Sequence, residues 1–169
     1  MVSDFMSQAR GLLAGGATQE SLDAVGKLLA ESSREPGFVT ESEMRSLHGS
    51  ESSFAILQTD PDGLTLMLSR FSPEAPTPVH DHKSWGVACV VGGRDRYVHW
   101  EKTPDGGVKV LYEKELSPGS FVTWLAPPHD IHSQQGIDED AMELVLFGKD
   151  VTQVARDYYD AESGRPIKR

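Results

Sequence analysis

The chain has 169 residues, of which 38% are hydrophobic and 25% are charged, a balance typical of one folded globular domain spanning residues 1–169. Its 26 acidic and 16 basic residues give a formal net charge of −10 at pH 7. This charge argues against general binding to nucleic acid or to anionic membranes, because both attract basic surfaces.

Up to about residue 50, in the segment 1–50, the sequence predicts a helical N-terminal extension. Apolar residues recur at helical spacing between residues 19 and 33, directly after Thr18, which suits an N-cap. Thr40 and Glu43 have the spacing of a capping box, which predicts the start of another helix.

From Ser53 onward the hydrophobic pattern changes to a period of two, and turn signals separate short runs of β-branched and aromatic residues. This pattern predicts an all-β sandwich or barrel whose core covers residues 53–160. The runs that we expect to be strands are 53–59, 64–71, 85–93, 96–102, 108–116, 120–125 and 142–148.

The sequence contains no apolar run of the ~20 residues that a membrane span needs. Its first twenty residues lack the basic start and long apolar stretch of a signal peptide. The single cysteine, Cys89, cannot form an internal disulfide, which suits a reducing compartment. We therefore expect a cytoplasmic protein.

Two histidines, His80 and His82, stand one residue apart in the stretch "TPVHDHKSWG". On a strand they project from the same face, with Asp81 on the other. Some fifty residues later, "PPHDIH" offers His132 at the start of another strand. These residues indicate a metal site; the alternative is two solvated histidines on an ordinary strand. His129 competes with His132 as the third ligand, or is a loop histidine beside the site.

Three stretches carry a resemblance to a known family: "HDHKSWGVACVVGG", "LSPGSFVTWLAPPHDIHSQQG" and "LVLFGKD". They resemble the cupin superfamily, and most closely its cysteine dioxygenase-type thiol dioxygenases, in the bacterial branch that includes 3-mercaptopropionate dioxygenase. The resemblance covers about residues 53–160 and, in outline, the N-terminal helices. It implies an all-β fold, the cupin double-stranded β-helix (jelly-roll) barrel with an N-terminal helical extension.

The resemblance also implies an Fe(II) cofactor held by three neutral histidines, and His80, His82 and His132 match the ligand positions. Most cupins carry a glutamate shortly after the histidine pair, whereas this chain has Gly86 and Val87 there. The thiol dioxygenases lack that carboxylate as well. Three neutral imidazoles leave a ferrous ion its full charge and open positions for a thiolate or enolate and O2. Imidazole also suits zinc, nickel and copper, so the residues alone leave the metal open.

An acidic protein that binds a small carboxylate needs a positioned arginine, whose guanidinium can donate two parallel hydrogen bonds. Arg156 matches the arginine that binds the substrate carboxylate in the mercaptopropionate branch; the alternative is charge pairing with Asp157 or Asp160. Arg70 ends a row of alternate leucines on one strand face and is the second candidate. The alternative is that Arg70 lies at a strand end with its guanidinium exposed to solvent.

The chain departs from the thiol dioxygenase pattern on its last strand. Glu143, Val145 and Phe147 stand where these enzymes usually carry serine, histidine and tyrosine. The cysteine–tyrosine crosslink of some cysteine dioxygenases is also missing, since Cys89 is displaced by two residues and Phe147 replaces the tyrosine. The histidines therefore support an iron site better than they support a thiol substrate. We expect His48 and His99 to be structural.

The expected function is that of an Fe(II)-dependent dioxygenase that oxidises a small thiol-bearing carboxylate to its sulfinate with O2. Two alternatives stay open: a cupin oxygenase acting on a non-thiol such as a diketone or a phenolic acid, and a non-catalytic cupin that binds a metal or a small ligand. The expected partners are a small thiol or carboxylate and O2, with no nucleic acid and no membrane. Edge strands of an open barrel often pair, so a homodimer is also possible.

Overall fold

The computed structural model describes residues 1–47 and 53–167, so the expected structural role of His48 lies outside the described residues. Three α-helices come first: α1 (Val2–Leu12), α2 (Gln19–Ser32) and α3 (Glu41–Leu47). No helix in these ranges is long and apolar enough to cross a membrane.

Both predicted helix starts are confirmed. The Thr18 hydroxyl accepts a hydrogen bond from the backbone N–H of Ser21 in the first turn of α2. At the start of α3, the backbone N–H of Thr40 donates to the Glu43 carboxylate at 2.7 Å, and the N–H of Glu43 donates to the Thr40 hydroxyl at 3.1 Å. These bonds satisfy amide groups that a helix cannot pair internally.

The remainder of the described chain is mainly strand, and each of the seven predicted strands is present. The strands are β1 (Phe54–Thr59), β2 (Thr65–Phe71), β3 (Val79–His80), β4 (Gly86–Gly92), β5 (Asp95–Lys102), β6 (Val108–Leu116), β7 (Phe121–Trp124), β8 (Ile131–Gly136), β9 (Ala141–Phe147), β10 (Tyr158–Tyr159) and β11 (Pro166–Ile167), with a 3-10 helix η1 (Val151–Gln153) before β10.

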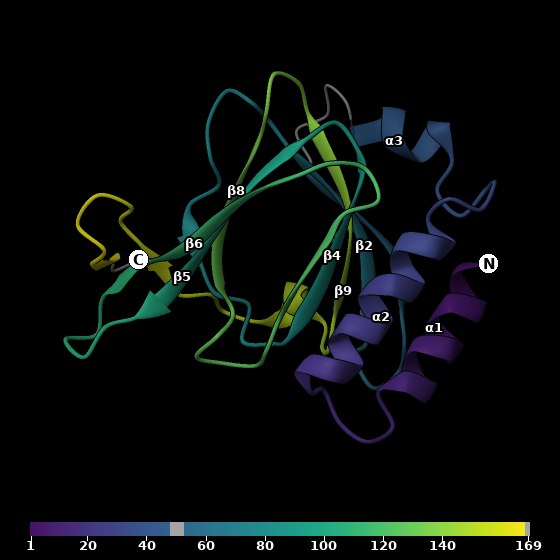
Figure 1. Cartoon of the computed structure of the whole chain (residues 1–169), viewed down its shortest axis with the longest axis horizontal. Helices are drawn as coiled ribbons and strands as arrows, with labels where there is room; N and C mark the ends of the chain where they lie inside the picture. The colour runs from purple at the N-terminus through teal and green to yellow at the C-terminus, as the bar shows by residue number, and fades with distance from the viewer. Residues whose placement is uncertain (48–52, 168–169) are drawn as a thin grey trace.

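The strands form two antiparallel sheets, in the orders β1-β2-β9-β4-β7 and β11-β10-β3-β8-β5-β6. Within them, β2-β9-β4-β7 faces β3-β8-β5-β6, which is the strand order of an eight-stranded jelly roll made of two Greek keys. The prediction of an all-β cupin barrel with an N-terminal helical extension is therefore confirmed (Figure 1).

The first sheet is buried on both faces, because successive side chains of a strand point to opposite sides. Its outer face packs against α1 and α2, which lie over β2, β4 and β9 in Figure 1. Its inner face lines the barrel interior. The outer-face core includes Phe5, Leu22, Leu29, Leu66, Leu68, Val87, Cys89, Leu144 and Leu146, and the interior core includes Met67, Ala88, Val90, Tyr97, Val122, Trp124, Val145 and Phe147.

Candidate metal centre

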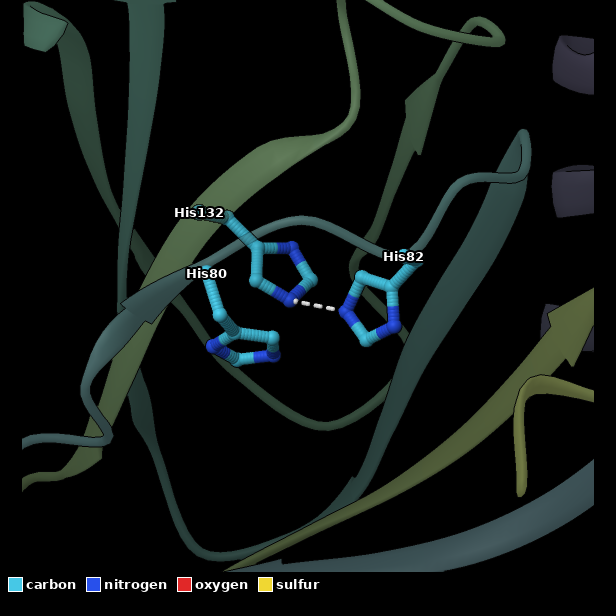
Figure 2. Close-up of side chains that lie close together, drawn as sticks. All are labelled: His80, His82 and His132. Atoms are coloured by element: carbon cyan, nitrogen blue, oxygen red, sulfur yellow. Dashed lines mark hydrogen bonds between the residues drawn. The ribbon is translucent and has the colours of Figure 1, made fainter. Parts of the chain in front are cut away.

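Three histidines meet inside the barrel (Figure 2). His80 ends β3 and lies opposite His132 of β8 in the sheet register, and His82 follows two residues later. Their exposed fractions are only 6% for His80, 4% for His82 and 3% for His132. One ring nitrogen from each lies within 4.8 Å of the others, so the structure brings the three predicted ligands together.

Hydrogen bonds orient these rings toward a common point. The Nδ1 of His80 lies 2.7 Å from the carbonyl oxygen of Pro78, which can only accept, so Nδ1 carries the proton and Nε2 keeps the lone pair. The Nε2 atoms of His82 and His132 approach to 2.8 Å, as the dashed line in Figure 2 marks. The structure therefore presents three imidazole nitrogens to one place, which fits the donor set that divalent transition metals prefer.

Burial keeps the three rings neutral. It lowers the pKa of His80 to about 4, with a further contribution from the positive charge of Arg156. Burial and the neighbouring histidines lower the pKa of His82 and of His132 well below the ordinary value. Since a histidine must be deprotonated to bind a metal, all three are in the binding form at neutral pH.

Trp124 closes the space beside Gly86, a position at which the sequence lacks a carboxylate. A Cβ atom on Gly86 would lie 2.1 Å from Cζ2 of Trp124, so no side chain fits at this position unless the indole moves. The indole N–H donates to the carbonyl of Ser84 at 3.1 Å, and its ring lies beside His82, as does that of Phe147. Within the described residues, the candidate metal ligands at this site are the three histidines.

The backbone leaves the sheet directly after His80, which differs from the expectation of a strand through His82. The amide N–H groups of His82 and Lys83 both donate to one carboxylate oxygen of Asp130, at 3.0 and 2.7 Å. Lys83 has a positive φ of 54° and forms ion pairs with Asp81 and Asp157. Asp130, which holds this turn, was missed in the sequence, although it stands inside the "PPHDIH" stretch.

A cavity of about 120 Å³ opens beside the three histidines. Its wall is mostly apolar, with a few polar groups and one arginine. The other lining residues are Ser53, Phe54, Met67, Ser69, Phe71, Thr77, Gln134, Val145, Phe147 and Arg156. Of the three residues that depart from the thiol dioxygenase pattern, Val145 and Phe147 thus face the cavity, and Glu143 lies fully buried on the same strand.

Arg156 joins the histidines in this cavity. Neither carboxylate considered as its partner pairs with it: Asp157 binds Lys83, and Asp160 accepts hydrogen bonds from Ser163. Across residues 1–47 and 53–167, no carboxylate forms an ion pair with Arg156. Burial lowers its pKa from the ordinary value, and arginine nevertheless stays charged in proteins. The cavity therefore contains a guanidinium that is available to an anion.

Arg70 lies elsewhere. The leucine row that it follows, Leu66 and Leu68, packs against the helices on the outer face of the sheet, while Met67 and Ser69 face the cavity. Arg70 forms an ion pair with Asp140 at 3.2 Å and is not among the residues that line the cavity.

The other histidines lie outside the triad. His129 is exposed on the loop between β7 and β8. His99 is buried on β5, where its Nδ1 lies 3.3 Å from the Tyr97 hydroxyl and its ring stacks on Tyr112 with 5.0 Å between ring centroids. These contacts give His99 a place in the core.

No family model and no curated protein sequence matches this chain. Among solved structures, it is similar to a capsular polysaccharide assembling protein from Staphylococcus aureus, at 17% identity and a TM-score of 0.50, over 66% of this chain and 31% of that one. An oxalate oxidase in complex with glycolate gives 17% identity and a TM-score of 0.48, over 65% and 57% of the two chains.

A cupin 2 conserved barrel domain protein from Leptotrichia buccalis gives 15% identity and a TM-score of 0.46, over 62% of this chain and 45% of that one. The chain thus spans a little over half the length of the oxalate oxidase, at 57%. At such identities the likeness concerns the fold alone, the jelly-roll barrel described above.

Proposed function

We propose that this chain is an Fe(II)-dependent dioxygenase that oxidises a small thiol-bearing carboxylate to its sulfinate with O2. The observation that carries the proposal is the shared cavity of three neutral histidines and an arginine without a carboxylate partner in the described chain. In this proposal His80, His82 and His132 hold the iron, and Arg156 binds the substrate carboxylate through two parallel hydrogen bonds.

Iron bound there would supply a positive charge for the thiolate and the redox chemistry that O2 requires. The protein contributes position and a dry environment. Met67, Val145 and Phe147 form an apolar wall beside His82 and His132, which excludes water and strengthens the pull of Arg156 on an anion. With three neutral histidines as its protein ligands, a bound iron would keep its charge for anionic substrate groups.

The size of the cavity favours a small aliphatic substrate. A cavity of about 150 Å³ admits benzene in another protein, and this one measures about 120 Å³. A thiol acid with on the order of six non-hydrogen atoms fits that space better than a phenolic acid does. Val145 and Phe147 are apolar where the thiol dioxygenases usually carry polar side chains. This difference favours a second candidate, an oxygenase for a small non-thiol such as a diketone.

The test begins with elemental analysis of the wild type and of His82→Ala, each purified without chelator. We expect about one iron per chain in the wild type and its loss in the variant. Fe(II)-loaded protein is then mixed with oxygen and 3-mercaptopropionate, cysteine or mercaptosuccinate, while oxygen uptake and sulfinate formation are followed. Iron binding without uptake for any thiol would contradict the thiol assignment and favour the second candidate.

The two arginines are compared in the same assay. Arg156→Met is expected to raise KM roughly 10–100-fold, because a hydrogen-bonded pair of charges is lost. Arg70→Met, which removes an equal guanidinium on the outer face of the sheet, is expected to leave KM within about twofold. An equal effect of the two substitutions would contradict the role of Arg156.

A further inference from the structure

A buried polar cluster lies inside the barrel next to the histidines, formed by Asp95 of β5, Gln134 of β8 and Glu143 of β9. Their exposed fractions are 0%, 3% and 0%. The amide nitrogen of Gln134 lies 2.7 Å from Oε2 of Glu143 and 3.1 Å from Oδ2 of Asp95. The other Asp95 oxygen accepts from the backbone N–H of Gln135 at 3.2 Å.

This cluster fixes which way the Gln134 amide points. Both of its N–H groups face carboxyl oxygens, which are the acceptors that such donors require. A reversed amide could accept the one proton of the two acids, but its oxygen would then face the other, ionised carboxylate, which is costly in a barrel core. The cluster therefore holds the nitrogen of Gln134 toward the two acids.

The amide oxygen is consequently the group that Gln134 has left for the cavity. Gln134 lines the same space as Arg156 and the three histidines. No donor in the described ranges of the chain reaches its side-chain oxygen. The wall of the cavity thus presents a fixed hydrogen-bond acceptor in addition to the cationic guanidinium.

Two buried acids side by side repel each other when both are ionised, so their surroundings favour keeping a proton. Burial and the negative charge of Asp95 raise the pKa of Glu143 well above its ordinary value. Burial raises the pKa of Asp95 to about 6, against the opposing effect of the hydrogen bond from Gln134. Both shifts favour a state in which one acid keeps its proton while the other is ionised, and in that state the cluster still anchors the amide.

We propose that Gln134 is a specificity-determining residue whose amide oxygen accepts a hydrogen bond from a hydroxyl group of the substrate. The substrate class is then a small hydroxy carboxylate and, resting on the proposed function, a thiol acid that also carries a hydroxyl group. A hydroxyl suits the site better than an ammonium group, because the positive charges of Arg156 and a bound metal outnumber the single negative charge of the Asp95–Glu143 pair.

The test compares ligands that differ only in this hydroxyl: 3-mercaptopropionate with 3-mercaptolactate, and propionate with lactate. Their dissociation constants are measured by calorimetry without oxygen on Fe(II)-loaded wild type, Gln134→Met and Gln135→Met. We expect the wild type to bind the hydroxylated member of each pair roughly tenfold more tightly. Gln134→Met should lose this preference, and Gln135→Met should keep it, because the Gln135 amide donates to the Pro73 carbonyl instead.

Equal binding of both members by the wild type overturns the proposal, and this comparison does not depend on any variant folding. A preference that survives in Gln134→Met also overturns it, since the hydroxyl would then bind the metal. Tighter binding of alanine than of lactate would refute the claim that the Gln134 oxygen accepts from a hydroxyl rather than from an ammonium group. If none of these ligands binds, the claim that this cavity binds a small carboxylate is refuted. A Gln134-dependent preference for lactate without oxidation of any thiol would keep this inference and refute the proposed reaction.

Discussion

Gly86 illustrates how one missing side chain shapes the metal centre. A Cβ atom there would meet Trp124 at 2.1 Å, far inside van der Waals contact. We expect Gly86→Ala to lower the free energy of unfolding by about 1–3 kcal/mol, the usual result of overpacking a core. Urea unfolding of the metal-free protein measures this change.

Gly11 of α1 is the matched control, because a Cβ atom there would have nothing within 4 Å. Gly11→Ala should leave the free energy of unfolding unchanged or raise it by up to about 1 kcal/mol, since alanine favours a helix. Similar destabilisation in both variants would refute the idea that Trp124 closes the space beside Gly86.

At the scale of single residues, the sequence predicts the place of some site residues well and that of others not at all. His80, His82 and His132 can be read from two short motifs, because each motif is local and its neighbours identify it. The contact between Gly86 and Trp124, and the turn of the Gln134 amide toward Asp95 and Glu143, depend on strands that the fold brings together from distant parts of the chain. No local pattern records such contacts.

At the scale of elements, β3 positions the histidines by ending early. Asp130, in the loop before β8, accepts from two consecutive amides and so directs His82 toward the other rings. We expect Asp130→Ala to weaken metal binding roughly 10–100-fold, the usual effect of losing a group that orients a ligand. Competition with a chromogenic chelator measures the affinity.

Glu113→Ala is the control for this experiment, because Glu113 pairs with Arg96 on the surface of β5 and β6, away from the histidines. It should leave metal affinity unchanged. Asp130→Asn, which keeps one oxygen acceptor, is expected to fall between the wild type and Asp130→Ala. Unaltered affinity in Asp130→Ala would show that the turn after β3 is held by other contacts.

Strand β2 shows where periodicity stops being informative. Alternation correctly predicts that Leu66 and Leu68 share one face, with Arg70 at its end, but the sheet has a core on each side. The leucines face the helices, and Met67 and Ser69 face the cavity. A period of two separates the faces without indicating which of them meets the histidines.

At the scale of the whole molecule, the jelly roll was predictable because the histidine motifs and turn spacing together resemble a cupin. The N-terminal helices were also predictable, since their caps and apolar spacing are local. Their docking on the outer face of the first sheet was not, because it depends on contacts between distant parts of the chain. Beside its apolar core, the barrel interior holds two groups of titratable side chains with opposite responses to pH: the neutral histidines and the Asp95–Glu143 pair.

The opposing responses predict a stability maximum for the metal-free protein. As pH falls below 6.5, the unfolded chain binds protons on histidines that the folded chain keeps neutral, so stability is lost toward acid. As pH rises above the ordinary glutamate pKa of 4.5, the folded chain keeps a proton on Glu143 that the unfolded chain releases, so this contribution is lost toward base.

Between pH 7 and 8 the histidines contribute equally to the wild type and to Glu143→Gln, so the difference between the two proteins isolates the Glu143 proton. Relative to the variant, the wild type should lose up to about 1.4 kcal/mol of unfolding free energy per pH unit in this range, the value for one proton. Glu143→Gln, which cannot release a proton, should lack this loss. Parallel curves for the two proteins in urea unfolding would mean that Glu143 is ionised in the folded state, and that its carboxylate is balanced by a charge outside the buried cluster.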